Sequence, residues 1–247
     1  MQVLLIDADV VAHKFAWAAE EKLEFKPGVF TWWADLNVTK PKVDDWLNEQ
    51  MEITESDDLI LVFSSPNNFR LKIEPNYKSN RKGKYRPLLI DDIRKYLETS
   101  WRSKTYNNLE ADDAMGIIAT ANTKHDYIVA SIDKDLNTIP GRHYNWSKPE
   151  LGIYEISEDE AAKMFYTQAL SGDPVDGYPG CPGIGQKRAS RIVEDNWPNP
   201  WKAIVEQYQK KDLDEEFALK QARMAKILSR DEYDLESERI LLWKPPD

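Results

Sequence analysis

Three short runs of nearly uninterrupted apolar residues, at 3–6, 59–63 and 127–131, most constrain how this chain can fold. Runs of this length without polar alternation are typical of strands buried on both faces of a parallel sheet. The sequence therefore predicts an α/β fold with a central, mostly parallel sheet flanked by helices. Helical spacing is found at residues 11–19, 43–51, 88–99, 114–121, 158–170 and 214–229.

Two other segments complete the prediction. Residues 152–156 are expected to form a further strand. Residues 24–40 contain Pro27, Gly28 and two adjacent tryptophans without a clear period, so we expect a loop there.

Composition sets the broad class of protein. The chain has 247 residues, 41% of them hydrophobic, which is enough for a sizeable core in one large or two small domains. No apolar run is long enough to span a membrane, and the N-terminus lacks a signal-peptide pattern, so no membrane partner is expected. The single cysteine, Cys181, excludes an internal disulfide, suits a reducing cytoplasm and is expected to be buried.

Carboxylates follow two of the predicted strands. Asp7 and Asp9 come after the first apolar run, and Asp133 and Asp135 come after the run at 127–131. In open α/β sheets, binding and catalytic sites are built at the carboxyl ends of the strands. The sequence therefore predicts an acidic site at this edge.

A second acidic group, Glu110, Asp112 and Asp113, precedes the helix at 114–121. Acids in a first helical turn complement the helix dipole by about 0.3 to 1 kcal/mol each, which explains this group if it is taken alone. Carboxylates about 4 Å apart, however, repel by roughly 4 kcal/mol per pair at an effective dielectric constant of 20. The combined acidic set therefore favours a bound cation.

Basic residues are concentrated in one stretch, although the net charge is −10. An acidic total argues against a nucleic-acid partner, but the distribution of charge matters more. With Tyr77 and Tyr85 interleaved, the stretch favours an arm that follows a nucleic-acid backbone over a solvated surface loop. Its basic residues are Arg70, Lys72, Lys78, Arg81, Lys82, Lys84 and Arg86, against the single acid Glu74.

A glycine-rich turn lies near the start of a later helix. Gly180, Gly183 and Gly185 permit tight turns, and Lys187 and Arg188 open the helix that follows. Backbone N–H groups, the helix dipole and two cations can converge on a phosphate of DNA. An ordinary turn between helices is the alternative reading.

These features together resemble the 5′ nuclease superfamily, which includes flap endonucleases and the 5′ nuclease domains of bacterial DNA polymerases. The resemblance spans residues 1–195 and rests on Asp7, PNYKSNR in the arm, EADD, SIDKD, GDxxD and GxPGIGxKxA, in that order. Residues 75–81 and the tail QARMAKILSRDEYD also resemble the short 5′ to 3′ exonucleases of T-seven-like phages.

The resemblance implies a domain division. A PIN-like nuclease core is expected over residues 1–165, with a helical arch formed by the basic arm at 67–87. A helical region with a helix-hairpin-helix-like DNA-binding turn and a C-terminal tail is expected over residues 166–247.

A two-metal site is also implied. The candidate ligands offer only oxygen donors, and His13, His125 and His143 are expected outside the cluster, so the set suits Mg²⁺ or Mn²⁺ rather than Zn²⁺. The expected metal ligands are Asp7, Glu110, Asp112, Asp113, Asp133, Asp135, Asp173 and Asp176.

The same resemblance implies how DNA is held. Lys78 and Arg81 are expected to act as catalytic residues on the scissile phosphate, and Tyr77 to stack near the terminal base. The glycine turn is expected to hold the duplex and to bind a K⁺ ion. The expected DNA-binding residues are Arg70, Lys72, Tyr77, Lys82, Lys84, Gly183, Gly185, Lys187 and Arg188.

The implied function is that of a metal-dependent 5′ to 3′ exodeoxyribonuclease with 5′-flap endonuclease and RNA-primer-removing activity. Its partners would be double-stranded DNA with 5′ ends or flaps, RNA–DNA hybrids and phage replication proteins. A phage-encoded enzyme in the cytoplasm of a bacterial host is expected.

One departure and two alternatives accompany this prediction. The family usually has an aspartate after the strand at 59–63, where this chain has Ser64 and Ser65. A non-catalytic DNA-binding relative is therefore one alternative. The other is a haloacid-dehalogenase-type phosphatase with Asp7 as nucleophile, although that hypothesis leaves the basic arm and the glycine turn unexplained.

Overall fold

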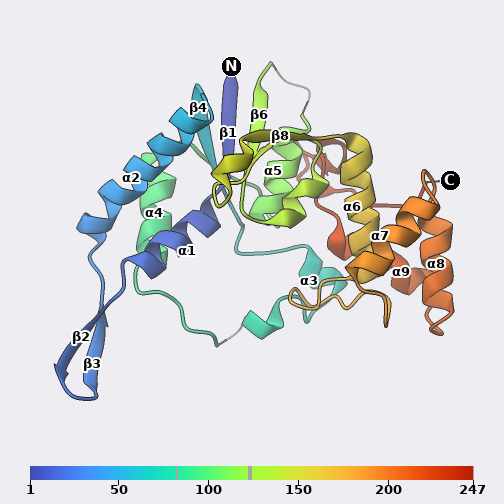
Figure 1. Ribbon diagram of the computed structural model, residues 1–247, viewed down its shortest axis with the longest axis horizontal. Helices are drawn as coiled ribbons and strands as arrows, with labels where there is room; N and C mark the ends of the chain where they lie inside the picture. The colour runs from blue at the N-terminus through green and yellow to red at the C-terminus, as the bar shows by residue number, and fades with distance from the viewer. Residues whose placement is uncertain (82, 122–123, 247) are drawn as a thin grey trace.

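The computed structural model describes residues 1–81, 83–121 and 124–246. Its centre is a sheet of six strands, counted within these ranges, in the order β5-β4-β1-β6-β7-β8 (Figure 1). Neighbouring strands are parallel except for β8, which runs antiparallel to β7. The strands are β1 Gln2–Asp7, β4 Asp58–Phe63, β5 Ser103–Thr105, β6 Asp126–Ala130, β7 Gly141–Tyr144 and β8 Ile153–Ile156.

The three predicted apolar runs form the adjacent strands β4, β1 and β6. Leu5 of β1 pairs with Ile60 on one side and with Val129 on the other, and all three side chains are buried. The prediction of a mostly parallel central sheet is therefore confirmed. The short strands β5 and β7 lack an apolar run, so the sequence pattern does not reveal them.

Helices cover both faces of the sheet. Successive side chains of a strand point to opposite faces. Leu4 and Ile6 pack in one cluster with residues of α1, α2 and α4, whereas Val3 and Leu5 pack in another with residues of α5. These helices are α1 Ala8–Ala18, α2 Leu36–Ile53, α4 Ile90–Ser100 and α5 Ala111–Ala119.

A further apolar cluster lies beside the sheet, among helices α6 to α9 (Figure 1). It includes Cys181, which is buried as predicted. The expected domain boundary at 165/166 falls inside α6, so one continuous helix joins the sheet to this cluster. The helices are α6 Glu158–Ser171, α7 Gln186–Asp195, α8 Trp201–Gln209 and α9 Glu215–Ala225.

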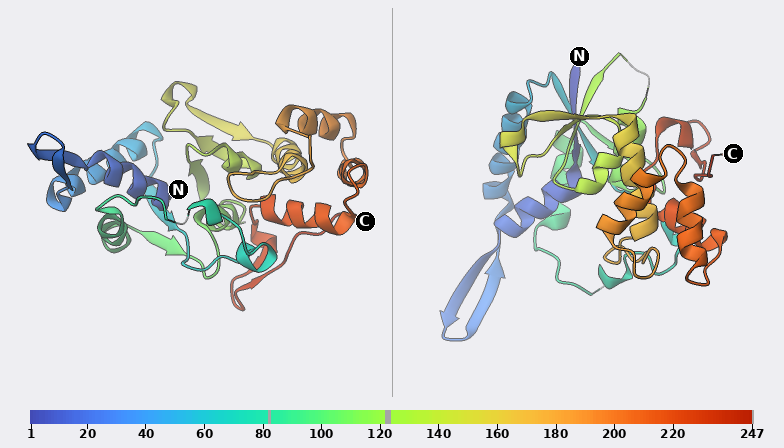
Figure 2. Two further views of the ribbon diagram at one scale, coloured as in Figure 1. Left: turned by 90° about the horizontal axis from the view of Figure 1, so that it is seen from below. Right: turned by 45° about the vertical axis from the view of Figure 1, so that its right-hand side comes forward.

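Residues 24–40 are not a loop, and this expectation is wrong. They contribute to a hairpin of β2 (Glu21–Lys26) and β3 (Val29–Trp33), and then to the start of α2. The hairpin projects away from the rest of the molecule (Figure 2). Aromatic side chains occur at both alternating positions of β3, at Phe30, Trp32 and Trp33, so no period of two is visible in the sequence.

The basic arm at 67–87 is only partly helical. It contains the single-turn helix α3 (Arg70–Ile73) and a 3-10 turn (Ser79–Arg81), and it crosses from β4 to α4 along one side of the molecule (Figure 1). Lys82 lies outside the described residues. Among the helices in the described ranges, none has the length and apolar content needed to cross a membrane.

Candidate functional site

A cavity of about 1080 Å³ opens where β1, β4 and β6 end. Lys78 and Arg81 of the arm line it together with most of the predicted metal ligands. The fold thus brings together acids and bases that the sequence separates widely. The predicted ligands in the lining are Asp7, Glu110, Asp112, Asp133, Asp135, Asp173 and Asp176, and Asp9, Asp91 and Glu98 line it as well.

Three of these acids are placed by the ends of secondary structure elements. Asp7 is the last residue of β1 and the N-cap of α1, where its Oδ1 accepts two backbone N–H groups at 2.9 and 3.2 Å. Asp133 caps the 3-10 helix Lys134–Thr138 in the same way, at 2.9 Å. Glu110 is the N-cap residue of α5. Local capping therefore fixes where the carboxylates of Asp7 and Asp133 point, whereas Lys78 and Tyr77 bind the carboxylate of Glu110.

Burial and mutual repulsion raise the pKa values of several carboxylates. The pKa of Asp7 is raised to about 7 by burial and by the neighbouring Asp9. Burial, Asp7 and Glu110 raise the pKa of Asp112, and burial and Asp133 raise that of Asp135 to about 6. These carboxyl groups therefore keep their protons at a pH where carboxylates are normally ionised. A bound cation would relieve the repulsion between the ionised carboxylates.

The raised pKa of Asp7 predicts how stability depends on pH in EDTA. Between the unfolded value near 3.8 and the folded value of about 7, the folded chain binds the proton more tightly. Stability should therefore be highest in the acidic part of this window and fall by up to a few kcal/mol as the pH rises through it. Urea denaturation between pH 5 and 7.5 measures this slope, and Asp7→Asn should flatten it. An equal slope in that variant would contradict the assignment.

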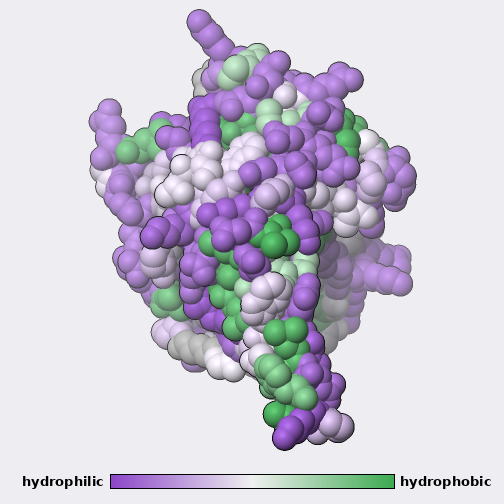
Figure 3. Space-filling model, turned by 90° about the vertical axis from the view of Figure 1, so that its left-hand side faces the viewer, coloured by the Kyte–Doolittle hydropathy of each residue, from purple (hydrophilic) through white to green (hydrophobic). Residues whose placement is uncertain are grey.

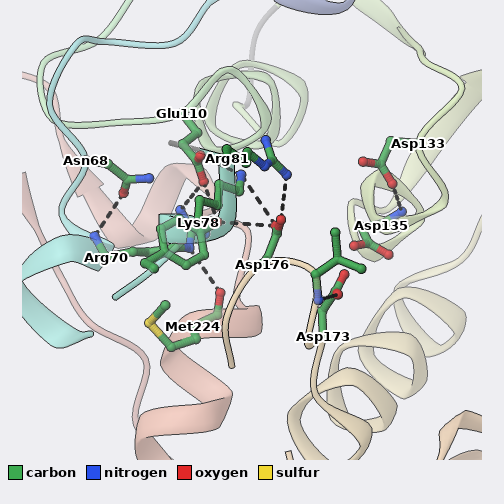
Figure 4. A network of polar contacts seen from close by, with 12 residues as sticks. Asn68, Arg70, Lys78, Arg81, Glu110, Asp133, Asp135, Asp173, Asp176 and Met224 are labelled. Atoms are coloured by element: carbon green, nitrogen blue, oxygen red, sulfur yellow. Dashed lines mark hydrogen bonds and ion pairs between the residues drawn. The ribbon is translucent and has the colours of Figure 1, made fainter. Parts of the chain in front are cut away.

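Lys78 and Arg81 reach the acids from the arm (Figure 4). Lys78 Nζ lies 2.7 Å from Glu110 Oε1 and 3.4 Å from Asp176 Oδ2, and Arg81 donates to Asp176 Oδ1 at 2.6 Å. Burial works against the charge of Lys78, but Glu110 and Asp176 outweigh it and raise the pKa of the ammonium. Lys78 therefore stays charged in the lining of the acidic cavity, which Arg81 lines as well.

Arg70 and Asp113 form a buried ion pair, which corrects two expectations. Arg70 donates to both carboxylate oxygens of Asp113, at 2.6 and 2.9 Å, and to the backbone carbonyls of Met224 and Lys226. Asp113 also accepts the N–H of Leu228 at 3.2 Å. Their exposed fractions are 3% and 0%, so Arg70 is not placed to contact DNA, nor Asp113 to bind a metal ion in the cavity. The pair instead ties the arm to α5 and to the C-terminal segment.

Tyr77 is also buried, in the cluster of α6 to α9. Its hydroxyl donates to Glu110 Oε2 at 2.8 Å, and burial raises the pKa of the phenol. A ring in this position cannot stack on a base, so that expectation is corrected. Tyr77 instead orients Glu110.

The remaining predicted DNA-binding residues in the described ranges lie on the surface. Lys72 and Lys84 are exposed on the arm. Gly185 is the N-cap of α7, and a Cβ added there or at Gly183 would meet nothing within 4 Å. The turn thus leaves open space in front of its backbone. The predicted DNA-binding residues that are exposed there are Gly183, Gly185, Lys187 and Arg188.

The third glycine of the turn has a packing role. Gly180 has a φ of +67°, and a Cβ there would lie 2.3 Å from the backbone N of Gly172. The two glycines therefore let the ends of the segment that carries Asp173 and Asp176 approach each other closely.

An ion pair in the lining that the sequence did not predict joins Arg94 to Asp9. Arg94 of α4 contacts Asp9 and donates to the carbonyl of Ser64 at 2.6 Å, while Asp9 accepts the N–H of Ser64 at 2.9 Å. Ser64 Oγ in turn accepts the N–H of Ala111 at 3.0 Å. No sequence spacing marks Arg94, because it meets Asp9 only once α4 packs beside α1.

The donor chemistry of the cavity fits a hard divalent cation, because its acids supply only oxygen ligands. Within the described residues, no three side chains form a ready-made ligand group. His13 also lines the cavity, where it lies near Asp9, and burial lowers its pKa. His143 is buried, with Nε2 2.8 Å from the carbonyl of Ile139.

Comparison with known proteins identifies the family. Residues 2–166 match the model of the N-terminal resolvase-like domain of 5′-3′ exonucleases. The chain belongs to the 5′-3′ exonuclease family. It is 28% identical to an exonuclease of Escherichia phage T7, over 76% of this chain and 74% of that protein. It is 27% identical to the flap endonuclease Xni of Shewanella baltica, over 51% and 52% of the two chains.

Solved structures support the same fold for this exonuclease family member. A flap endonuclease of bacteriophage T5 in complex with DNA and metal ions superposes with a TM-score of 0.67, at 16% identity, over 91% of this chain and 89% of that one. The chain is thus a nuclease of the 5′-3′ exonuclease and flap endonuclease family. This membership leaves no support for the phosphatase alternative.

Proposed function

We propose that this nuclease is a two-metal 5′ to 3′ exodeoxyribonuclease that also acts on 5′ flaps and on RNA in RNA–DNA hybrids. The observation that carries the proposal is the convergence of seven of the predicted ligand carboxylates with Lys78 and Arg81 on one cavity. Acids alone would repel a DNA backbone. Metal ions held by the acids, together with the two cations of the arm, reverse that repulsion.

Seven of the eight acids expected as ligands remain candidates for holding Mg²⁺ or Mn²⁺. Such ions, when bound, activate water and stabilise the leaving oxygen of a phosphodiester. The protein's part is to fix the carboxylates through the helix caps at Asp7 and Asp133, and to exclude Asp113 by pairing it with Arg70. The proposed ligands are Asp7, Glu110, Asp112, Asp133, Asp135, Asp173 and Asp176.

Lys78 and Arg81 are proposed to hold the scissile phosphate. Lys78→Ala is therefore expected to slow cleavage by about 10²- to 10³-fold, because a preorganised cation contributes most when charge develops in the transition state. Binding of the same DNA in Ca²⁺ should weaken much less. Single-turnover rates and fluorescence anisotropy separate the two effects, with Lys148→Ala on an exposed turn as the control. Equal losses of rate and affinity would make Lys78 a general phosphate contact.

A second contact is proposed at the glycine turn. The N-terminus of α7, with the open backbone of Gly183 and Gly185 and the exposed Lys187 and Arg188, suits a phosphate of the duplex. Lys72, Lys82 and Lys84 of the arm would contact other phosphates. A K⁺ ion at the turn remains part of the proposal. On this view residues 1–165, together with Asp173 and Asp176, cut the strand, and the rest of residues 166–247 holds the duplex.

The relatives of this chain are the basis for a proposal about its biological origin and its place of action. The phage exonucleases among them suggest a phage-encoded enzyme that works with phage replication proteins in the cytoplasm of a bacterial host.

Digestion of three 5′-labelled substrates tests the function. Duplex DNA, a 5′ flap and an RNA-primed duplex are each incubated with Mg²⁺, Mn²⁺ or EDTA. We expect label release only with a metal ion, and the relative rates rank the substrates. Tight DNA binding without release from any substrate would favour the non-catalytic relative and would make Ser64 and Ser65 the mark of lost activity.

A further inference from the structure

The hairpin of β2 and β3, none of whose residues lines the cavity, exposes apolar side chains (Figure 3). Every residue of both strands is exposed, and the exposed fractions of Phe25, Phe30 and Trp32 are 69%, 47% and 46%. An isolated two-stranded hairpin is at best marginally stable in water, and exposed apolar patches mark interaction sites. The exposed apolar side chains of the hairpin therefore indicate that it binds a partner.

The base of the hairpin is held in place. Glu20 accepts hydrogen bonds from the Tyr85 hydroxyl and from the N–H of Leu88, each at 2.8 Å. The rings of Trp17 and Tyr85 lie 5.6 Å apart beside it. These contacts present the hairpin in a defined direction, away from the sheet (Figures 1 and 2).

The hairpin also has backbone groups that no neighbouring strand in the described part of the chain pairs with. Within the described residues, β2 and β3 pair only with each other, so each strand has one edge of unpaired N–H and C=O groups. Such edges are templates for another strand, and proteins that avoid pairing usually cover them or place charges, especially lysine, on them. Strand β2 is exposed along its whole length and carries Lys22 and Lys26, so only a strand that places acids opposite these lysines matches it.

The sequence of β2, EKLEFK, is complementary to itself when two copies run antiparallel. With a two-fold axis at Leu23, Lys22 of one copy lies opposite Glu24 of the other, and the reverse pair follows by symmetry. Opposite charges directly across a strand pair are stabilising, and the two Leu23 side chains meet at the axis. We propose that β2 pairs with β2 of a second copy of this chain, which makes a four-stranded sheet from two hairpins.

Charge argues against a nucleic acid as the occupant. Strand β2 contains Glu21 and Glu24 against Lys22 and Lys26, so it carries no net charge. A surface for phosphates would carry an excess of positive charge. Strand β2 of a second copy places an acid opposite Lys22 and a lysine opposite Glu24.

Sedimentation velocity over a range of concentrations tests the proposal with the full chain. The wild type should pass from monomer to dimer. Lys22→Glu and Glu24→Lys should each weaken the dimer about tenfold or more, because each places like charges opposite each other. A mixture of the two variants should associate as the wild type does, since every cross-strand pair is again of opposite sign. Lys148→Glu makes the same charge change outside the hairpin and should have no effect.

Several outcomes would overturn the proposal. A wild type that stays monomeric at high concentration excludes the dimer, and a dimer insensitive to both charge variants excludes this edge. Failure of the mixed variants to associate excludes the proposed register. If the monomeric wild type instead binds single-stranded DNA and Trp32→Ala weakens that binding, the hairpin is a nucleic-acid surface. None of these readouts depends on cleavage.

Discussion

Asp133→Asn is expected to lose metal-dependent cleavage by about 10³-fold or more while its affinity for DNA in EDTA is preserved. Asp133 lines the cavity just past β6, and its carboxylate is oriented by capping the following turn. Asparagine keeps the cap but removes the charge needed to hold a divalent cation. Cleavage is measured under single-turnover conditions, and metal affinity by calorimetry with Mn²⁺.

A matched control makes the assignment of Asp133 specific. Asp159→Asn removes one carboxylate from the exposed first turn of α6, outside the cavity lining, and should cleave as the wild type does. Unchanged cleavage by Asp133→Asn would remove this residue from the metal site. A loss of DNA affinity equal to the loss of rate would mean that the variant perturbs the substrate surface as a whole.

Arg70→Ala is expected to lower the free energy of unfolding by about 3 to 5 kcal/mol, because it leaves the carboxylate of Asp113 buried without its partner. The exposed fraction of Asp113 is 0%, so water cannot take the place of the guanidinium without rearrangement. Two backbone carbonyls near the C-terminal segment lose their donor as well. Urea denaturation followed by circular dichroism measures the change.

Two further variants separate the ion pair from other effects. Lys72→Ala lies on the same short helix, is exposed, and should change stability by less than about 0.5 kcal/mol. The double variant Arg70→Met with Asp113→Leu removes both charges and should recover much of the lost stability. If Arg70→Ala unfolds no more easily than Lys72→Ala, the buried pair does not hold the arm to α5.

The acidic edge of the sheet was predictable because its signals are local. An apolar run predicts a buried strand, and the residue after it lies at the strand's end, so Asp7 and Asp133 could be placed without knowledge of their neighbours. The arm's Lys78 and Arg81 were placed through a motif that spans only a few residues. In each case the relevant information lies within a short window of sequence.

Local sequence signals did not predict the positions of Arg70 and Asp113. Both are charged residues of a kind expected at a functional site, and Arg70 lies in the basic arm while Asp113 lies in the EADD motif. Their burial depends on α3 lying against α5 and on the segment after α9 closing over them, contacts between residues 43 to 156 positions apart. The hairpin at 21–33 was missed for a different reason, because aromatic residues on both faces of β3 hide the alternation of a strand.

The sequence by itself determined the class of fold, the edge of the sheet where the site lies, and the chemistry of its oxygen ligands and basic arm. Only the tertiary structure decided which charges face the cavity and which are paired in the interior. The physical reason is that strand and cap signals act over a few residues, whereas the desolvation and pairing of a charge depend on every element packed around it.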